Sequence, residues 1–213
     1  MSAQQTIIAI DGTFASGKGT LAKALAAHYG FHYLDTGKLY RAAARDMLLA
    51  GEDPNDGGVA TRFAKAIDPQ SLDDPGLKQS EVAAAASQLA VHKTVRAALL
   101  DFQRRFAAQA PGAVLDGRDI GTVICPDAAV KLYIDAAPQE RARRRHAELV
   151  GYGEKLSLET VAAQLAERDA RDAGRTEAPL KPAQDSHLID TTDLSVEAVM
   201  KAATTIIDAV LTP

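Results

Sequence analysis

The stretch DGTFASGKGT, from Asp11 to Thr20, has the spacing Gly-x4-Gly-Lys between two segments of different periodicity. A β-branched run precedes it at residues 6–11, and residues 19–29 show the apolar spacing of a helix. In this context glycines let the backbone turn around an anion, and the helix start adds partial positive charge. We therefore predict a phosphate loop in which Lys18 reaches the outer phosphates of a nucleoside triphosphate. Its residues are Gly12, Thr13, Phe14, Ala15, Ser16, Gly17, Lys18, Gly19 and Thr20.

The residue after the lysine departs from the strict pattern, which places Ser or Thr there. Here Gly19 intervenes and the hydroxyl comes from Thr20, so direct ligation of Mg²⁺ by that hydroxyl is less expected. The simpler interpretation is a glycine-rich turn that caps the first helix. The strand and helix on either side favour the phosphate loop.

Short apolar runs alternate with longer helical patterns along the rest of the chain. This alternation predicts an α/β fold with a parallel sheet covered on both faces. Ligands bind such sheets at the carboxyl ends of the strands, where Asp11, Asp35 and Asp116 are expected. The predicted strands are 6–11, 31–34, 113–115, 130–134 and 187–189, and the predicted helices are about 19–29, 37–50, 79–110, 138–150, 157–174 and 195–211.

The pattern weakens at residues 51–78, which are rich in Gly, Pro and Asp. We expect loops there around one short helix. The chain has no internal repeat and no linker long enough to separate independent domains. Its 213 residues therefore predict one domain with excursions.

The composition excludes several classes of protein. Apolar residues make up 46% and charged residues 24%, which is unlike a disordered chain. The net charge of −4 gives no general attraction for nucleic acid or anionic lipid, so neither is expected as a partner. The single cysteine, Cys125, is expected to be buried and fits a reducing compartment. No apolar stretch approaches 18 residues, and the start, residues 1–5, lacks the pattern of a signal peptide, so we expect a cytoplasmic protein.

Two further clusters follow predicted strands. After the second strand, Thr36 is a plausible N-cap, and Tyr40 and Arg41 lie one helical turn later, where they could clamp a second anion. An ordinary cap with a solvated arginine is the alternative. After the third strand, Asp116 could hold Mg²⁺ through water beside the phosphate loop. Arg118 adds a forked hydrogen-bond donor there and Asp119 adds an acceptor. The alternative is that residues 116–119 form a tight turn with surface charges.

The helix predicted at 157–174 carries an apolar stripe, including Leu158 and Leu165, that turns charged at Arg168, Asp172 and Arg175. Burying that charge is unfavourable unless a polar partner meets it, and an anionic ligand in a cleft would do so. The competing interpretation is a helix that runs off the core and carries weak surface ion pairs.

A dense guanidinium cluster lies in the preceding predicted helix. Arginine suits bidentate phosphate contact and neutralisation of a phosphoryl group in transfer. We expect one or two of the four to be functional and leave open which. They are Arg141, Arg143, Arg144 and Arg145.

With these clusters the chain resembles the bacterial cytidylate kinases, of the nucleoside monophosphate kinase family. The resemblance runs through the whole chain in order. The matching segments are 11–20 (DGTFASGKGT), 34–41 (LDTGKLYR), 84–90 (AAASQLA) with Arg96, 116–134 (DGRDIGTVICPDAAVKLYI), 167–185 (ERDARDAGRTEAPLKPAQD) and 189–195 (IDTTDLS).

The resemblance implies a P-loop kinase fold of three layers that transfers a phosphoryl group from ATP to CMP or dCMP with Mg²⁺. It implies a single domain with a core (1–35, 96–145 and 177–213), a substrate-binding part near 36–95 and a mobile lid near 146–176. A monomer is expected. In-line transfer would depend on positioning and on charge neutralisation.

Roles for individual residues also follow from the resemblance. The loop from Gly12 to Thr20 is similar to the ATP phosphate cradle, and Asp116 would hold the metal through water. The catalytic set would be Lys18, Arg118, Arg168 and Arg175. The substrate-binding set would be Thr36, Tyr40, Arg41, Ser87, Arg96, Asp116, Arg118, Asp119, Arg168, Asp172 and Arg175.

Base selection has a physical rationale at Asp119. A carboxylate can accept the 4-amino hydrogens of cytosine and would face the 4-oxo group of uracil, so UMP should be a poorer substrate. The chain departs from the family pattern at Thr13 and Phe14, where Pro and Ser are associated with the loop, and at Thr36, where Ser is common. Residues 66–81 are also too few for the three-stranded excursion that many bacterial members carry.

Two rival functions stay open on the residues alone. The first is a kinase of the same fold for another acceptor, such as AMP, UMP or shikimate. The second is a nucleotide-binding switch that regulates a partner. A switch has no need of a second anion site, so the arginines at 41, 118, 168 and 175 argue against it.

Overall fold

The computed structural model of the chain describes residues 5–211. Residues 1–4 lie outside this range. They belong to the segment 1–5, from which we predicted that the chain has no signal peptide. The strands form one all-parallel sheet in the order β2-β3-β1-β4-β5. This confirms the predicted α/β class. The strands are β1 (Thr6–Gly12), β2 (His32–Asp35), β3 (Gly112–Asp116), β4 (Val130–Asp135) and β5 (His187–Asp190).

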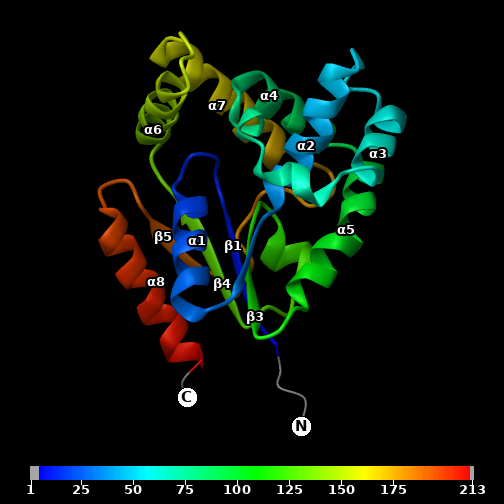
Figure 1. The fold of residues 1–213 in the computed structure, drawn as a ribbon. Coiled ribbons are helices and arrows are strands. Elements are labelled where there is room, and N and C mark those ends of the chain that lie inside the picture. Colours follow the sequence, from blue (N-terminus) through cyan, green and yellow to red (C-terminus); the bar gives the residue numbers. More distant parts are fainter. Residues whose placement is uncertain (1–4, 212–213) are drawn as a thin grey trace.

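Helices cover both faces of the sheet (Figure 1). Helices α1 and α8 pack on one face and α5 packs on the other, while α2, α3, α4, α6 and α7 lie over the carboxyl ends of the strands. The helices are α1 (Lys18–Tyr29), α2 (Thr36–Leu49), α3 (Gly57–Lys65), α4 (Ser80–Leu89), α5 (Lys93–Ala107), α6 (Pro138–Gly151), α7 (Leu158–Ala173) and α8 (Val196–Leu211).

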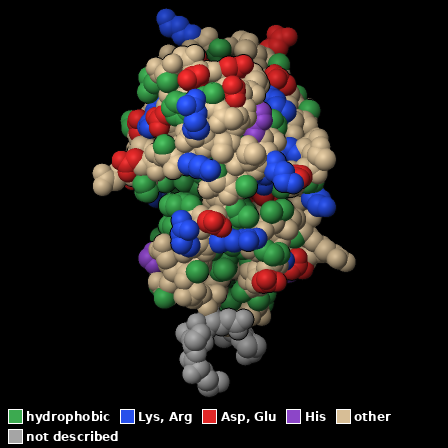
Figure 2. Space-filling model, turned by 90° about the vertical axis from the view of Figure 1, so that its right-hand side faces the viewer, with side chains coloured by type: hydrophobic (Ala, Val, Ile, Leu, Met, Phe, Trp, Pro, Cys, Tyr) green, Lys and Arg blue, Asp and Glu red, His purple; other side chains and the backbone are tan. Residues whose placement is uncertain are grey.

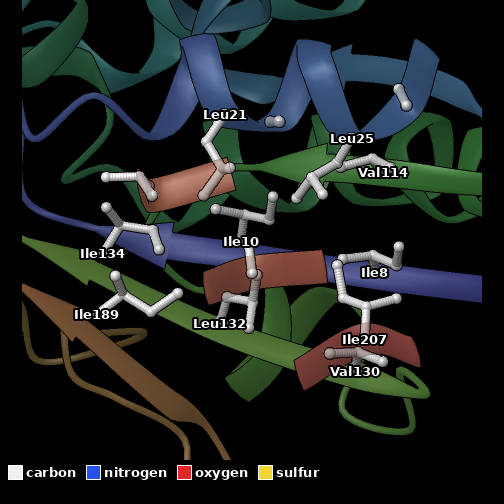
Figure 3. Close-up of a cluster of buried hydrophobic side chains, with 14 residues drawn as sticks. Ile8, Ile10, Leu21, Leu25, Val114, Val130, Leu132, Ile134, Ile189 and Ile207 are labelled. Carbon is white, nitrogen blue, oxygen red and sulfur yellow. The ribbon is translucent and has the colours of Figure 1, made fainter. Parts of the chain in front are cut away.

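The central strand β1 is buried on both faces because its side chains alternate between two apolar clusters. Ile8 and Ile10 point to the cluster formed with Leu21, Leu25 and the C-terminal helix (Figure 3). Ala9, between them, faces the cluster under α5. Burying one such isoleucine contributes about 1.5–3 kcal/mol. This packing fixes where the loop after β1 emerges from the sheet.

The prediction of a single helix at 79–110 is wrong. The structure has two helices in this segment, α4 and α5. The apolar stripe of α4 ends at Leu89, and polar residues His92 and Lys93 follow where the next buried position would fall. The stripe resumes with Val95 and Leu99. Each helix buries its stripe against different partners, α4 on α2 and α5 on α3 and β3, so the chain turns between them.

Between β2 and β3 the described chain forms helices and turns without a strand. The predicted short helix is α3, and two 3₁₀ turns, Pro69–Asp73 and Pro75–Lys78, follow it. These helices share a cluster of their own around Leu39 and Met47. The absence of a three-stranded excursion, expected from the short sequence, is therefore confirmed for this segment.

No helix within residues 5–211 is long and apolar enough to cross a membrane. On the face shown in Figure 2, Lys and Arg side chains are interspersed with Asp and Glu. Cys125 is buried, as expected.

Candidate active site

A cleft of about 410 Å³ lies over the carboxyl ends of the strands. It is lined by the N-terminus of α1, by α2 and α4, and by the charged half of α7. Sequence positions far apart therefore meet in one place, and the four arginines predicted to form a second anion site share it with Lys18. The predicted residues that line the cleft are Phe14, Ala15, Gly17, Lys18, Gly19, Thr20, Thr36, Tyr40, Arg41, Ser87, Arg96, Asp116, Arg118, Asp119, Arg168, Asp172 and Arg175.

The other three residues of the predicted loop, Gly12, Thr13 and Ser16, do not line the cleft but fix the conformation of the loop. A Cβ at Gly12 would lie 1.9 Å from the backbone oxygen of Ile134, so only glycine allows the loop to leave the sheet here. The Ser16 hydroxyl donates to the backbone oxygen of Thr13 at 2.9 Å, and the Thr13 hydroxyl donates to Asp135 Oδ1 at 2.6 Å. These bonds hold the loop in its curved shape.

Lys18 is the first residue of α1 and is buried at the floor of the cleft. Its Nζ donates to the backbone oxygen of Thr13 at 3.2 Å. Burial, with the charge of Arg118, lowers the pKa of Lys18 to about 7. A buried ammonium beside another cation favours a bound anion.

Two carboxylates stand beside this lysine at the ends of neighbouring strands. The Tyr33 hydroxyl donates to Asp116 Oδ2 at 2.8 Å. Burial, with the charge of Asp35, raises the pKa of Asp116 to about 6. Asp35 accepts from Arg41 Nη2 at 2.6 Å, and although burial opposes it, that guanidinium holds the pKa of Asp35 below its usual range. Asp35 was not among the predicted site residues, and its place at a strand end was the available signal.

Asp172 is the carboxylate at which three arginines converge, and only 1% of its side chain is exposed. It accepts from Arg118 Nε at 2.9 Å and from Arg175 Nη2, and Arg168 Nε lies 3.9 Å from its Oδ2. Although burial opposes it, these arginines, Arg118 first, hold the pKa of Asp172 below its usual range.

The arginine donors are not all satisfied. Within the described residues the buried Nε atoms of Arg41, Arg168 and Arg175 have no hydrogen-bond partner. Buried donors without partners carry an energetic cost, and an anion with several oxygens would remove it. The cleft is therefore suited to an anionic group beside these arginines.

The charged face of α7 turns inward, so the interpretation of these residues as surface pairs is wrong. Val161 and Leu165 are buried on the same stripe. Leu158, which we expected on that stripe, is the first residue of the helix and is 42% exposed. Arg175 lies just past the end of α7 and still reaches the cleft.

Hydrogen-bonding side chains from four further positions also line the cleft. Arg96 Nη2 donates to Asp119, which is buried. Burial raises the pKa of Asp119 in spite of the neighbouring arginines. The Ser87 hydroxyl accepts from Arg171 Nη1 at 2.8 Å. Burial raises the pKa of Tyr40 to about 12, so its phenol is neutral and can donate.

Thr36 has a different local role from the one expected. Asp35 occupies the N-cap position of α2, and Thr36 is the first residue inside the helix. Its hydroxyl donates to the backbone oxygen of Asp116 at 2.8 Å, which joins the ends of β2 and β3 under the cleft. The N-cap prediction for Thr36 is wrong because the strand continues one residue further than expected.

The guanidinium cluster divides into distinct environments. Arg144 and Arg145 line the cleft. Arg141 is buried and structural, since it donates to the backbone of Ala136 and Phe14 and to Asp169 at 2.6 Å. The Arg143 side chain is 70% exposed. These different environments result from the orientation of α6 relative to the loop.

Sequence reasoning missed several contacts that assemble the site. The Thr191 hydroxyl donates to the backbone oxygen of Ser16 at 2.8 Å, behind the loop. Glu154, in the turn between α6 and α7, accepts from the backbone N–H of Ser80 at 2.9 Å and from its hydroxyl. Thr191 lies within one of the matching segments, 189–195. Nothing in the sequence pattern indicated the contact between Glu154 and Ser80.

A divalent metal would have few protein ligands here. Within residues 5–211 no group of three or more His, Cys, Asp or Glu side chains could hold a metal ion. Asp116, with its raised pKa and its neighbour Asp35, offers carboxylate oxygen beside the loop. This donor set fits Mg²⁺, which binds through one or two carboxylates, waters and the phosphates of a ligand.

The chain is similar to known proteins over most of its length. A family model described as cytidylate kinase matches residues 8–209. The chain is 54% identical over 204 residues to a cytidylate kinase of Rhodopseudomonas palustris, with 96% of each chain covered. It is 50% identical over 205 residues to a cytidylate kinase of Rhizobium meliloti, with 96% of this chain and 97% of that protein covered.

Solved structures share the fold at lower identity. The chain is similar to TT1252 from Thermus thermophilus, with a TM-score of 0.51 at 24% identity over 99% of this chain and 100% of that one. It is also similar to a gluconokinase from Sinorhizobium meliloti, with a TM-score of 0.51 at 12% identity over 99% of this chain and 96% of that one.

Proposed function

The chain belongs to the cytidylate kinase family, and from this premise we propose how its cleft works. The enzyme transfers the γ-phosphoryl group of ATP to CMP or dCMP, which gives ADP and CDP or dCDP. Such a transfer needs two nucleotides with their phosphates facing each other, so the cleft has to hold two anions side by side.

ATP binds with its phosphates in the loop from Gly12 to Thr20. The curved backbone, the start of α1 and the buried Lys18 support this assignment. Lys18 contacts the group in transfer and offsets the charge that develops on it. Asp116 would hold Mg²⁺ through water, and the ion would supply charge neutralisation on the phosphate oxygens.

The acceptor phosphate binds opposite, between Arg41, Arg118 and Arg175. Their common cleft and the unpartnered Nε atoms of Arg41 and Arg175 support this arrangement. Arg168, on α7, would neutralise the phosphoryl group as it moves. Asp172 fixes Arg118 and Arg175 by hydrogen bonds, and we assign it to the ribose side of the acceptor.

The cytosine ring binds among Thr36, Ser87, Arg96 and Asp119. The burial of Ser87 and Asp119 favours discrimination, because a base that leaves a buried polar group unpaired binds poorly. Asp119 accepts the 4-amino hydrogens of cytosine. Uracil presents an oxygen there instead, so UMP is the poorer substrate.

The larger parts follow from the same arrangement. We propose that residues 36–95 form the substrate-binding part, that residues 146–176 form a lid, and that the core comprises 1–35, 96–145 and 177–213. Closure of the lid excludes water from the reaction and limits ATP hydrolysis. A monomer is sufficient, since every residue assigned to the cleft comes from one chain.

The observation that carries this assignment is the meeting of Arg41, Arg118 and Arg175 in one cleft with Lys18. An ADP-release assay with CMP, dCMP, UMP and AMP as acceptors tests it. We expect CMP and dCMP to be used, UMP to be used at least about tenfold less efficiently, as one mispaired polar group predicts, and AMP to be used least. A preference for AMP would overturn the assignment of the base site.

ATP binding should take up a proton above neutral pH. The pKa of Lys18 is about 7 in the free enzyme, so at pH 8 most Lys18 is neutral, whereas the phosphates are fully ionised and favour the ammonium. We expect an uptake approaching about one proton at pH 8 and a smaller one at pH 6, where Lys18 is already charged. Calorimetry in two buffers of different ionisation enthalpy measures it.

The matched control for proton uptake is Lys18→Ala, which removes the titrating group. The variant should bind ATP with a heat that no longer depends on the buffer at pH 8. Equal heats in both buffers for the unmodified enzyme would show that Lys18 is already protonated before ATP binds.

A further inference from the structure

Phe14, at the tip of the phosphate loop, packs on the helices that follow β4 and not on the sheet. Its side chain contacts the apolar cluster formed by α6 and α7, which includes Leu149, Val161 and Leu165. Its backbone oxygen accepts from Arg141 Nη1 at 3.2 Å. The loop is thus joined to the proposed lid through one aromatic residue.

The ring of Phe14 is also the surface on which guanidinium groups gather. The guanidinium carbon of Arg168 lies 3.9 Å from the ring centroid, and those of Arg145 and Arg118 lie at 5.3 and 5.9 Å. All three are within the range of a cation–π interaction, and Arg168 is the closest of the three.

Arg168 has few other partners that could orient it. Its Nε is buried without a hydrogen bond among the described residues, and Asp172 Oδ2 is 3.9 Å from that atom, beyond hydrogen-bond reach. Burial and the neighbouring Arg118 lower the pKa of Arg168, so its surroundings disfavour the cation. The negative face of an aromatic ring offsets this effect.

We propose that Phe14 is a positioning residue that holds Arg168 over the phosphate loop with its N–H groups free for the phosphoryl group in transfer. A carboxylate partner would hold the arginine equally well but would occupy the N–H groups that the phosphate needs. A ring contacts the guanidinium carbon and leaves those donors unused. Since Phe14 is part of the loop and Arg168 part of α7, the contact places the arginine at the ATP phosphates whenever α7 covers the loop.

This inference rests on the proposed function, and a double-mutant cycle tests it. Phe14→Leu keeps an apolar side chain for the contact with α6 and α7 but has no aromatic face. We expect it to lower kcat for CDP formation about tenfold, as the loss of one desolvated cation–π contact predicts. The KM values for ATP and CMP should change less than about threefold, because the contact acts on the transferred group. Phe14→Tyr should restore kcat to within about twofold, since its ring keeps the same face.

The decisive measurement is made in an Arg168→Ala background. If Phe14 acts through Arg168, Phe14→Leu should lower kcat less than about twofold there. Hydrogen exchange of the free enzyme gives a second readout: Phe14→Leu should speed exchange of the amides of α7 and leave those of α1 unchanged. Phe106→Leu, on α5 away from the cleft, is the matched control and should change neither quantity.

Two results would overturn the proposed role of Phe14. One is an equal, additive loss of kcat in both backgrounds. The other is a kcat of Phe14→Tyr that is as low as that of Phe14→Leu. Either can be seen only if the unmodified enzyme makes CDP from CMP, and its failure to do so would count against the proposed function instead.

Discussion

Replacing Lys18 by Ala should lower kcat for CDP formation by about 10³-fold, the effect expected when a preorganised charged donor to the reacting group is lost. The side chain is 7% exposed and donates to the loop's own backbone, so its charge sits in a site of low polarity, where it acts strongly on a phosphoryl group. Steady-state turnover at saturating ATP and CMP measures the loss.

The fold should survive this substitution. In the free enzyme burial disfavours the ammonium of Lys18, so removing it relieves a cost as well as leaving a small space. Thermal unfolding should show a midpoint within a few degrees of that of the unmodified enzyme. Lys23→Ala, an exposed residue of the same helix, is the control and should keep full turnover. Normal turnover of the Lys18 variant would refute its role.

Replacing Arg118 by Ala should lower kcat/KM for CMP by about 10³-fold, because the charged donor that we propose for the acceptor phosphate and the orientation of that phosphate are lost together. ATP should still bind with a dissociation constant changed less than about threefold, because the charge of Arg118 opposes that of Lys18 and its removal does not weaken the loop. Calorimetry with ATP, and initial rates over a range of CMP concentrations, separate the two effects.

Loss of Arg118 should not destabilise the fold by leaving the buried carboxylate of Asp172 without a partner. Asp172 keeps its hydrogen bond from Arg175, and Arg168 stays nearby. The exposed Arg143 of α6 provides the control, and Arg143→Ala should behave as the unmodified enzyme does. An Arg118 variant that loses ATP affinity as much as CMP efficiency would place this arginine on the donor side.

Part of the site was predictable because its signals are local. The glycine spacing from Gly12 to Gly17, the strand before it and the helix after it are properties of neighbouring residues. Charged residues on the stripe of α7 indicated a polar partner for the same reason. The α/β class followed from the alternation of short apolar runs with helical patterns, and a parallel sheet brings the ends of its strands to one edge.

Other features depended on contacts between distant segments. The long helix predicted at 79–110 divides because its two halves pack on different helices. Among the arginines of α6, only the angle at which the helix faces the loop sends Arg144 and Arg145 to the cleft and leaves Arg143 in solvent. The orientation of Phe14 toward Arg168 likewise had no signal in the spacing of either residue.

The amino-acid sequence by itself determined the parallel sheet, the glycine-rich loop after β1 and the set of charged residues that could meet in one cleft. Only the tertiary structure decided which charges meet, that Asp172 holds Arg118 and Arg175 from separate elements, and that an aromatic ring serves as the partner of Arg168. The physical reason is that periodicity and turn chemistry act over a few residues, whereas burial and charge pairing depend on neighbours that folding alone brings together.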